Sequence, residues 1–401
     1  MISPWIDALS TANQDLMNQD LIRHLKVRST PNAAFMTFNG LNLLSFSSND
    51  YLGLSNHPHL IQSLAEGAKL YGVGSGASSL ISGHTIAHQL LEYHLAQTQS
   101  KHIPDTGACF INSGFMANIA LLTALAKLSE VSIYSDSLNH ASLIDGIRMA
   151  KVQSNAKVFV YPHGDLSALK TCLQADKSLY KLIVTDAVFS MDGDIADLAS
   201  LTEMAEQHQA LLYIDDAHGF GVFGNLGHGL LEYFDICSPN IIYMATLGKA
   251  VGVSGAFIAA SQCWIDWLIQ TSRPVIFSTA PSPAISHTIL KSLELIESTE
   301  GKVRREQLHT LIRYWNTHAQ FKRWIKFPSK SAIQPLMIGS NHDVLKISKE
   351  LQDTGYWVPA IRPPTVPKDL ARLRISLNAE HTLGHLDDLL EQLFKIESAC
   401  R

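Results

Sequence analysis

Residues 211–224 read LLYIDDAHGFGVFG, and this stretch decides the fold class. Its first four residues are apolar without polar alternation, as in a strand that helices cover on both faces of a mostly parallel sheet. Two carboxylates, Asp215 and Asp216, and the imidazole of His218 follow directly. A doubly wound open sheet binds its ligand at the carboxyl ends of the strands, so these side chains mark a candidate site.

Other short apolar or β-branched runs lie on both sides of this stretch, and helical patterns alternate with them. This alternation predicts an α/β fold with a mostly parallel central sheet of about seven strands. The candidate strands are 108–111, 132–134, 157–160, 182–185, 211–214, 241–244 and 256–259.

Three regions of different character are expected along the 401 residues. Residues 1–45 form an N-terminal helical arm, in which an amphipathic helix runs to a point just before Pro31. Residues 46–285 form the large ligand-binding domain. Residues 286–401 form a smaller α+β C-terminal domain that begins in a long helical stretch and closes with a helix from about His385.

The charge balance argues against nucleic-acid binding through phosphate neutralisation. Lys plus Arg total 31 against 36 Asp plus Glu, a formal net charge of −5, whereas such proteins normally carry a basic excess. The first residues show no basic stretch followed by an apolar one, and no apolar run reaches the roughly 18 residues of a membrane span. We therefore expect a cytoplasmic protein without membrane contact.

The cysteines are widely spaced, with no C-x-x-C pair and no cysteine–histidine cluster. We expect reduced thiols that serve packing, and no metal site. They are Cys109, Cys172, Cys237, Cys263 and Cys400.

Two glycine runs fit dinucleotide-binding patterns, but their context does not. Residues 219–224 match G-x-G-x-x-G, and residues 72–77 match its alanine variant. The first run is not followed at once by a helix, and the second follows a helical pattern instead of a strand. A nicotinamide site is therefore disfavoured, and a glycine-rich loop near a ligand or a tight chain crossing is the better interpretation.

Lys249 follows the apolar run 241–244 and lies among small residues in GKAVGVSGA, residues 248–256. In a tight, poorly hydrated place an unprotonated lysine amine can form a Schiff base. Taken alone, an exposed lysine in a glycine-rich loop is an equally good interpretation. A serine nucleophile of the S-x-x-K type is absent, because residue 246 is threonine.

Lys249 and three other features match the needs of pyridoxal 5′-phosphate (PLP). This cofactor needs a lysine for its aldehyde, a carboxylate opposite its ring nitrogen, a phosphate site and a flat group against its ring. Asp215, the Gly114–Phe115 turn and His140 can supply the last three, and a helix beginning near Gly114 would direct N–H groups at the phosphate. A nonenzymatic binding protein would have no use for this set.

Long motifs in fixed order resemble those of the α-oxoamine synthases, PLP enzymes of fold type I, over nearly the whole chain. The resemblance implies a fold type I transferase and a homodimer with active sites at the subunit interface. The motifs are NSGFMANIA (112–120), SDSLNHASLIDG (135–146), DAVFSMDGDIADL (186–198), YIDDAHGFGVFG (213–224) and TLGKAVGVSGAFI (246–258).

The resemblance also implies a role for each matching residue. Lys249 would bind the cofactor aldehyde and remove the amino acid's Cα proton, Asp215 would keep the ring nitrogen protonated, and His140 would stack on the ring. These three are the expected catalytic residues. The expected cofactor-binding residues are Gly114, Phe115, His140, Ser190, Asp215, His218, Thr246, Lys249, Ser278 and Thr279, of which Ser278 or Thr279 would reach the neighbouring subunit's cofactor.

Within this family, SAIQPLMIGSN (331–341) and WVPAIRPPTVPKDLARLRISL (357–377) are most similar to the acyltransferases that condense L-alanine with a pimeloyl thioester in biotin biosynthesis. The donor would be pimeloyl-ACP, on an acyl carrier protein, or pimeloyl-CoA. The alternative is a sister enzyme that uses glycine or serine with another acyl-CoA. The expected substrate-binding residues are Arg23, Asn49, His140, Arg362 and Thr365, with the Arg362 fork holding the alanine carboxylate.

One loop departs from the family pattern. Where many relatives have GGSR, residues 76–79 read GASS, so the role of that arginine is unfilled or transferred. A carrier protein would need a basic patch, for which Arg304–Arg305 and the Lys322, Arg323 and Lys326 group are candidates, although such groups more often are solvated helix faces.

Overall fold

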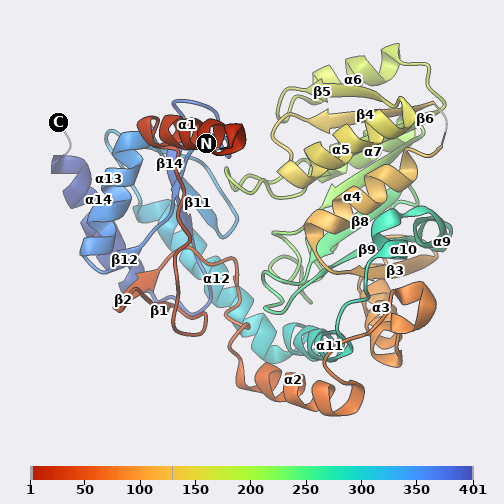
Figure 1. The fold of residues 1–401 in the computed structure, drawn as a ribbon, viewed down its shortest axis with the longest axis horizontal. Helices are drawn as coiled ribbons and strands as arrows, with labels where there is room; N and C mark the ends of the chain where they lie inside the picture. Colours follow the sequence, from red (N-terminus) through yellow and green to blue (C-terminus); the bar gives the residue numbers. More distant parts are fainter. Residues whose placement is uncertain (1–2, 129, 400–401) are drawn as a thin grey trace. The chain divides into compact units, whose positions relative to one another are not determined.

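The computed structural model describes residues 3–128 and 130–399, which divide into two compact units (Figure 1). The large unit comprises residues 49–190 and 194–307. The small unit comprises the chain before residue 49, residues 191–193 and the chain from residue 308. The large unit has one β-sheet and the small unit has two.

A seven-stranded sheet forms the centre of the large unit, and it contains every strand that the sequence predicts. The order is β3-β9-β8-β7-β6-β4-β5. Strands β8, β7, β6, β4 and β5 are parallel, and β9 is antiparallel to β3 and β8. The strands are β3 (Thr106–Ile111), β4 (Val131–Asp136), β5 (Lys157–Tyr161), β6 (Tyr180–Asp186), β7 (Ala210–Asp215), β8 (Ile241–Thr246) and β9 (Ala256–Ser261).

Helices cover this sheet, which explains why its strands lack polar alternation. On one face a continuous core joins Leu121 of α4, Ile147 of α5 and Leu268 of α9 to Val184 of β6 and Ile242 of β8. The helices of the large unit are α2 (Pro58–Tyr71), a π-helical turn η1 (Ser79–Gly83), α3 (Ile86–Gln99), α4 (Gly114–Leu125), α5 (Ala141–Ser154), α6 (Leu166–Ala175), α7 (Leu198–Gln207), α8 (Leu230–Phe234), α9 (Gln262–Thr271), α10 (Arg273–Phe277) and α11 (Pro283–Glu297).

The small unit has the α+β character expected from the sequence. One antiparallel sheet has the order β10-β11-β14-β13, and a second has the order β1-β2-β12. Helix α12 (Thr299–His318) belongs partly to each unit. The other elements are α1 (Pro4–Asn18), β1 (Phe35–Phe38), β2 (Leu41–Ser45), β10 (Ile325–Lys326), β11 (Ile333–Gly339), α13 (Asn341–Asp353), β12 (Tyr356–Trp357), β13 (Ala360–Ile361), β14 (Ala371–Ser376) and α14 (Leu383–Ala399).

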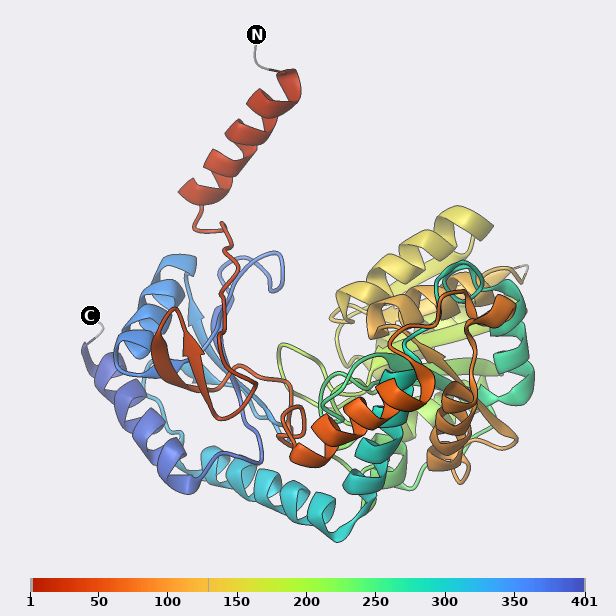
Figure 2. The same ribbon diagram turned by 60° about the horizontal axis from the view of Figure 1, so that its bottom comes forward.

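The N-terminal helix is shorter than the sequence pattern suggests. It ends at Asn18, and Asp20 adopts the left-handed region at φ 55°, which an α-helix cannot continue through. An extended segment follows, in which Arg28 forms a β-bridge with Phe38 (Figure 2). None of the described residues of α1 is buried. The apolar spacing after Asn18 therefore does not indicate a helix.

The sequence predicts no membrane span and no metal site, and it predicts free cysteine thiols. Among the residues with described positions, no helix is long and apolar enough to cross a bilayer. Within the same ranges, no group of His, Cys, Asp and Glu could hold a metal ion. Cys109, Cys172, Cys237 and Cys263 are free thiols, and Cys400 lies outside the described residues.

His163 is held between two carboxylates beside the carboxyl end of β4. Its Nδ1 lies 3.0 Å from Asp136 Oδ1, and its Nε2 lies 2.9 Å from Asp194 Oδ2. These hydrogen bonds raise the pKa of His163 from 6.5 to about 10. Asp136 also accepts hydrogen bonds from the backbone N–H groups of Leu138 and Gly164. The charged cluster thus fixes the turn that leads from β4 to His140.

The substitution His163→Gln should therefore destabilise the protein in a pH-dependent way. Because folding raises the pKa of His163, the stability gained from its protonated form is complete below pH 6.5 and is lost as the pH rises through about 10. Urea unfolding from pH 6 to pH 10 should show a deficit for the variant that shrinks with pH. The exposed His24, changed to Gln, is the control. A deficit that stays constant with pH would contradict the charged cluster.

Candidate active site

Asp215 stands at the carboxyl end of β7, next to Asp186 at the end of β6 in the parallel register. The Asp215 side chain is buried. Its Oδ1 accepts a hydrogen bond from the backbone N–H of Ala217 at 3.0 Å, and its Oδ2 accepts one from Asn118 Nδ2 at 2.8 Å. A buried carboxylate needs such donors to replace water, and a cation next to it would balance its charge.

Lys249, in the turn after β8, begins a chain of hydrogen bonds. Its Nζ lies 2.8 Å from His218 Nε2, and His218 Nδ1 lies 2.7 Å from the Tyr51 hydroxyl. Tyr51 donates its single hydroxyl hydrogen to Asn49 Oδ1 at 3.1 Å. Either ring nitrogen of His218 can donate or accept in this chain, according to its tautomer. The chain holds the His218 ring between the Tyr51 hydroxyl and the Lys249 amine.

Tyr51 is a residue of this site that the residue-by-residue sequence interpretation missed. It lies in FSSNDYLGLS, residues 46–55, where the sequence predicts a substrate contact for Asn49 alone. A buried tyrosine usually finds a hydrogen-bond partner for its hydroxyl. Nothing in the local pattern, however, indicates that its partner is His218, which lies far along the chain.

His140 caps the N-terminus of α5 and lies at the same edge of the sheet. Its backbone N–H donates to Asp186 Oδ2 at 2.6 Å, and its Nδ1 lies 2.7 Å from Ser142 Oγ. Burial lowers the pKa of His140 below its ordinary value. Burial, with the nearby charge of Asp215, raises the pKa of Asp186 well above its ordinary value. His140 is thus neutral near pH 7, which suits a ring that stacks on another ring.

Gly114 and Thr246 form a narrow cradle at the start of α4. Ser113 caps the helix by accepting a hydrogen bond from the backbone N–H of Met116 at 3.3 Å. A Cβ atom on Gly114 would lie only 2.6 Å from Thr246 Cγ2. Phe115 follows with a partly exposed side chain. The first turn of the helix therefore presents backbone N–H groups and a positive dipole end, as an anion site requires.

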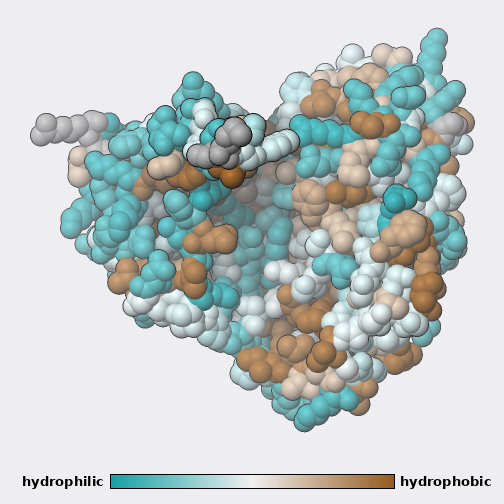
Figure 3. Space-filling view, viewed as in Figure 1, coloured by the Kyte–Doolittle hydropathy of each residue, from teal (hydrophilic) through white to brown (hydrophobic). Residues whose placement is uncertain are grey.

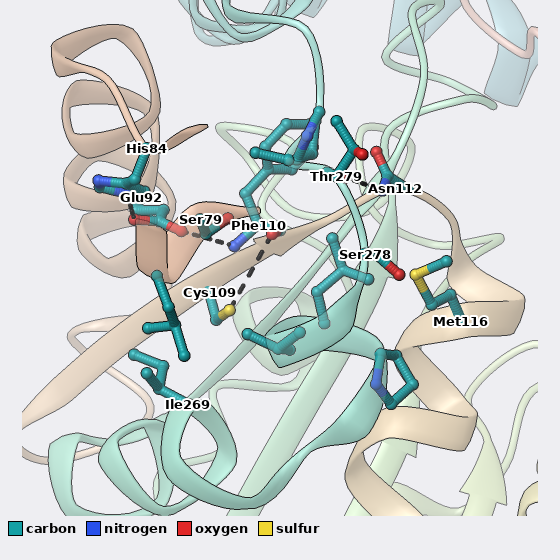
Figure 4. A pocket seen from close by; sticks show the side chains of 16 residues that line it. Ser79, His84, Glu92, Cys109, Phe110, Asn112, Met116, Ile269, Ser278 and Thr279 are labelled. Atoms are coloured by element: carbon teal, nitrogen blue, oxygen red, sulfur yellow. Dashed lines mark hydrogen bonds and ion pairs between the residues drawn. The ribbon is translucent and has the colours of Figure 1, made fainter. Parts of the chain in front are cut away.

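Ser190, Ser278 and Thr279 occupy other parts of the large unit. Ser190 lies in the loop beyond Asp186 and is half-buried. Ser278 and Thr279 line a cavity of about 290 Å³ together with Asn112, whose Nδ2 donates to the Thr279 carbonyl at 3.2 Å (Figure 4). Ser278 and Thr279 follow α10 directly; Ser278 is half-buried and Thr279 is exposed.

The loop that departs from the family pattern lies at the same cavity. Ser78 forms a β-bridge with Thr279, and Ser79 begins η1 and lines the cavity. The described residues that line this cavity include no Arg or Lys.

Three expected substrate residues lie close together in the small unit, whereas Asn49 lies in the large unit. Arg23 Nη2 donates to the Pro363 carbonyl at 2.8 Å, and the Thr365 N–H donates to the Arg362 carbonyl at 3.1 Å. The guanidinium of Arg362 donates to the carbonyls of Asp20 and Ile22, while its buried Nε has no partner among the described residues. The Arg362 fork thus bonds to backbone carbonyls in this structure, and a bound carboxylate would have to replace them.

The residues of the large unit fit PLP by their chemistry. The buried Asp215 carboxylate can face a protonated ring nitrogen, and the Lys249 amine can bind the aldehyde. The glycine cradle at the start of α4, which a Cβ would fill, suits the phosphate. Each of these groups comes from the segment following a strand or from the helix start at the same sheet edge.

Comparison with known proteins agrees with this geometry. Residues 42–393 match the family "Aminotransferase class I and II". The chain is 50% identical to an 8-amino-7-oxononanoate synthase from Janthinobacterium sp. (strain Marseille), over 94% of this chain and 95% of that protein. It is 48% identical to one from Bordetella petrii, over 98% and 99% of the two chains.

Solved structures agree as well. A serine palmitoyltransferase from S. paucimobilis with bound PLP-myriocin aldimine superimposes with a TM-score of 0.88 at 25% identity, covering 98% of this chain and 97% of the other. An 8-amino-7-oxononanoate synthase from Francisella tularensis superimposes with a TM-score of 0.74 at 30% identity, covering 89% and 98%.

The chain therefore belongs to the class I and II aminotransferase family, whose fold type I enzymes use PLP. Within that family it belongs with the 8-amino-7-oxononanoate synthases. The expected fold class and cofactor are thereby confirmed. The roles of the individual site residues stay predictions.

Filling the cradle at Gly114 should weaken PLP binding. The new methyl group of Gly114→Ala meets Thr246 Cγ2, and overpacking of about 1–3 kcal/mol corresponds to an affinity about 5- to 150-fold lower. Titration of the apoprotein with PLP measures this loss. Adding Thr246→Ser removes Cγ2 but keeps the hydroxyl, so the double variant should regain affinity. An equally weak double variant would argue against the steric explanation.

Proposed function

We propose that this chain condenses L-alanine with a pimeloyl thioester to give 8-amino-7-oxononanoate, CO₂ and the free carrier thiol, as a step of biotin biosynthesis. One observation supports this proposal most directly. The Lys249–His218 pair and the buried Asp215 lie at one sheet edge in a chain that is 50% identical to an 8-amino-7-oxononanoate synthase. When bound, PLP supplies an electron sink for the carbanion at Cα.

Each site residue of the large unit has a separate proposed role. Lys249 would bind the cofactor and carry the proton at the amino acid's Cα, oriented by its contact with His218 Nε2. Asp215 would keep a proton on the ring nitrogen, because a carboxylate in a buried place favours an adjacent cation. His140, neutral through burial, would cover the ring face. His218 and Ser190 would bind the ring's 3′-oxygen.

The reaction forms a carbon–carbon bond between Cα of alanine and the thioester carbonyl carbon. The carbon–sulfur bond breaks, and the thiol leaves with a proton. The bond from Cα to the carboxylate then breaks to release CO₂, and a proton returns to Cα. The carboxylate must therefore be held for the first step and released for the second.

Arg362 is the proposed carboxylate clamp, with Asn49 assisting it, and Arg23 and Thr365 are the proposed contacts of the acyl substrate. Arg23 Nη2 and the Thr365 N–H both bond to backbone carbonyls of residues 362–363. Burial and the neighbouring Arg23 charge lower the pKa of Arg362. A bound carboxylate would offset this repulsion between two guanidinium groups.

A homodimer, in which Ser278 or Thr279 would reach the partner's cofactor, is also part of the proposal. The exposed apolar side chains of the large unit include Leu80 and Ile81 of η1 and Phe277 of α10. Apolar surface is visible on this unit in Figure 3. Contiguous apolar patches of more than a few hundred Å² mark protein–protein contacts, so we expect these side chains to lie at the dimer contact.

The acyl carrier is the least constrained part of the proposal. Arg304 binds the Leu52 carbonyl and Glu300, and the buried Arg305 binds the carbonyls of Ile296 and Asn225. This pair therefore serves the fold and is not a docking patch. Lys322 and Arg323 are exposed, so this group stays the candidate surface for an acidic carrier.

The purified protein, loaded with PLP, should form 8-amino-7-oxononanoate from L-alanine and either pimeloyl-CoA or pimeloyl-ACP. Mass spectrometry of the product and the release of CO₂ measure the reaction. Lys249→Ala should give no product, since no other described side chain takes the place of its amine. A preference for glycine or L-serine would point instead to a sister enzyme, such as the structurally similar serine palmitoyltransferase.

Arg362→Ala should raise the KM for L-alanine about 10- to 150-fold, since hydrogen bonds to a charged group contribute about 1.5–3 kcal/mol. The KM for the pimeloyl thioester should change much less. Steady-state kinetics with each substrate varied in turn separate the two effects. Arg313→Ala, on the exposed side of α12, is the matched control. An unchanged KM for L-alanine would refute the clamp.

A further inference from the structure

Asn118 is a fully buried polar residue in an apolar helix. It lies in the second turn of α4, and its neighbours Ala117, Ala120 and Leu121 belong to the core. A buried amide without partners would be costly, so its hydrogen bonds decide why it is tolerated there. The roles implied by the sequence motifs do not include it.

The Asn118 amide uses its donors and its acceptor within one buried network. Its Nδ2 donates to Asp215 Oδ2 at 2.8 Å and to Ser142 Oγ at 2.7 Å, and its Oδ1 accepts from the Tyr213 hydroxyl at 2.5 Å. Burial holds the pKa of Tyr213 well above its ordinary value, so the phenol keeps its hydrogen. A flipped amide would face the Asp215 carboxylate with oxygen, so only one orientation satisfies the network.

The orientation of Asn118 sets the direction of the next hydrogen bond. Ser142 Oγ accepts from Asn118 and can therefore donate its own hydrogen to His140 Nδ1, at 2.7 Å. The backbone N–H of Ser142 also points to Nδ1, at 3.3 Å. Nδ1 thus accepts hydrogen bonds from both the hydroxyl and the backbone N–H of Ser142, so the proton of the neutral ring lies on Nε2.

We propose that Asn118 is a positioning residue that aligns the Asp215 carboxylate with the cofactor's ring nitrogen and, through Ser142, holds the His140 ring in one tautomer and orientation. The inference rests on the proposed function, because both residues act there on PLP. One amide thus couples the carboxylate that would face the ring nitrogen to the imidazole that would cover the ring. Among the described residues, the other hydrogen-bond donor to Asp215 is the N–H of Ala217.

A network that served only stability would behave differently. Tyr213 contributes a buried hydrogen bond to the same amide, but it touches neither Asp215 nor His140 through any hydrogen bond of this network. Tyr213→Phe keeps the ring and removes that bond alone. It is the matched control, since it disturbs the folding of the same region without removing a donor to Asp215.

The test compares Asn118→Leu and Asn118→Ala with Tyr213→Phe and the parent protein. Both Asn118 variants lose the donor to Asp215, one by an apolar side chain of similar size and one by truncation, so the second variant serves as the test if the first fails to fold. The measurements are the PLP dissociation constant of each apoprotein, the induced circular dichroism of the bound cofactor and the thermal unfolding temperature without PLP.

We expect the Asn118 variants to bind PLP at least about tenfold more weakly and Tyr213→Phe less than about threefold more weakly. The induced dichroism should change in the Asn118 variants, because the ring loses its fixed alignment, and should persist in Tyr213→Phe. Ser142→Ala should change the dichroism with a smaller loss of affinity, since Asp215 keeps its donor.

Equal losses of affinity in the Asn118 variants and Tyr213→Phe, in step with their unfolding temperatures, would overturn the inference and leave Asn118 a structural residue. Unchanged affinity and dichroism in the Asn118 variants would overturn it as well. Failure of the parent protein to bind PLP or to form product would instead count against the proposed function, so the two failures are distinguishable.

Discussion

The structure of the site depends on one constraint, the burial of the Asp215 carboxylate at the end of β7. Removing a charge from water costs several kcal/mol unless donors and a partner cation replace the solvent. The Ala217 N–H and the Asn118 amide supply the donors. Their places depend in turn on the turn after β7 and on α4, so the sheet edge and the helix are arranged around this carboxylate.

The surrounding groups reach Asp215 and Lys249 through short chains of hydrogen bonds and not by direct contact alone. One chain runs from Asn49 through Tyr51 and His218 to Lys249. Another joins Asn118 and Ser142 to His140. Each chain links buried side chains from different elements, which restricts the positions of Lys249 and His140 before any ligand binds.

Several features of this arrangement could be predicted because they are periodic or local. The strand runs, the helix start at Gly114 and the polar residues after β7 and β8 all follow from burial on both faces of a parallel sheet. The N-terminal helix was predicted too long, because apolar spacing does not reveal the left-handed turn at Asp20. The Arg304–Arg305 pair resembled a solvated or docking face, yet Arg305 is buried against backbone carbonyls from other segments.

The sequence by itself determined the α/β class, the PLP cofactor and the family, because these depend on residue types, their order and local spacing. Only the tertiary structure decided that Tyr51 holds His218, that Asn118 joins Asp215 to His140 through Ser142, and that His163 bridges Asp136 and Asp194. The reason is physical: such hydrogen bonds join side chains from different strands and helices, and their geometry exists only once the sheet brings those segments together.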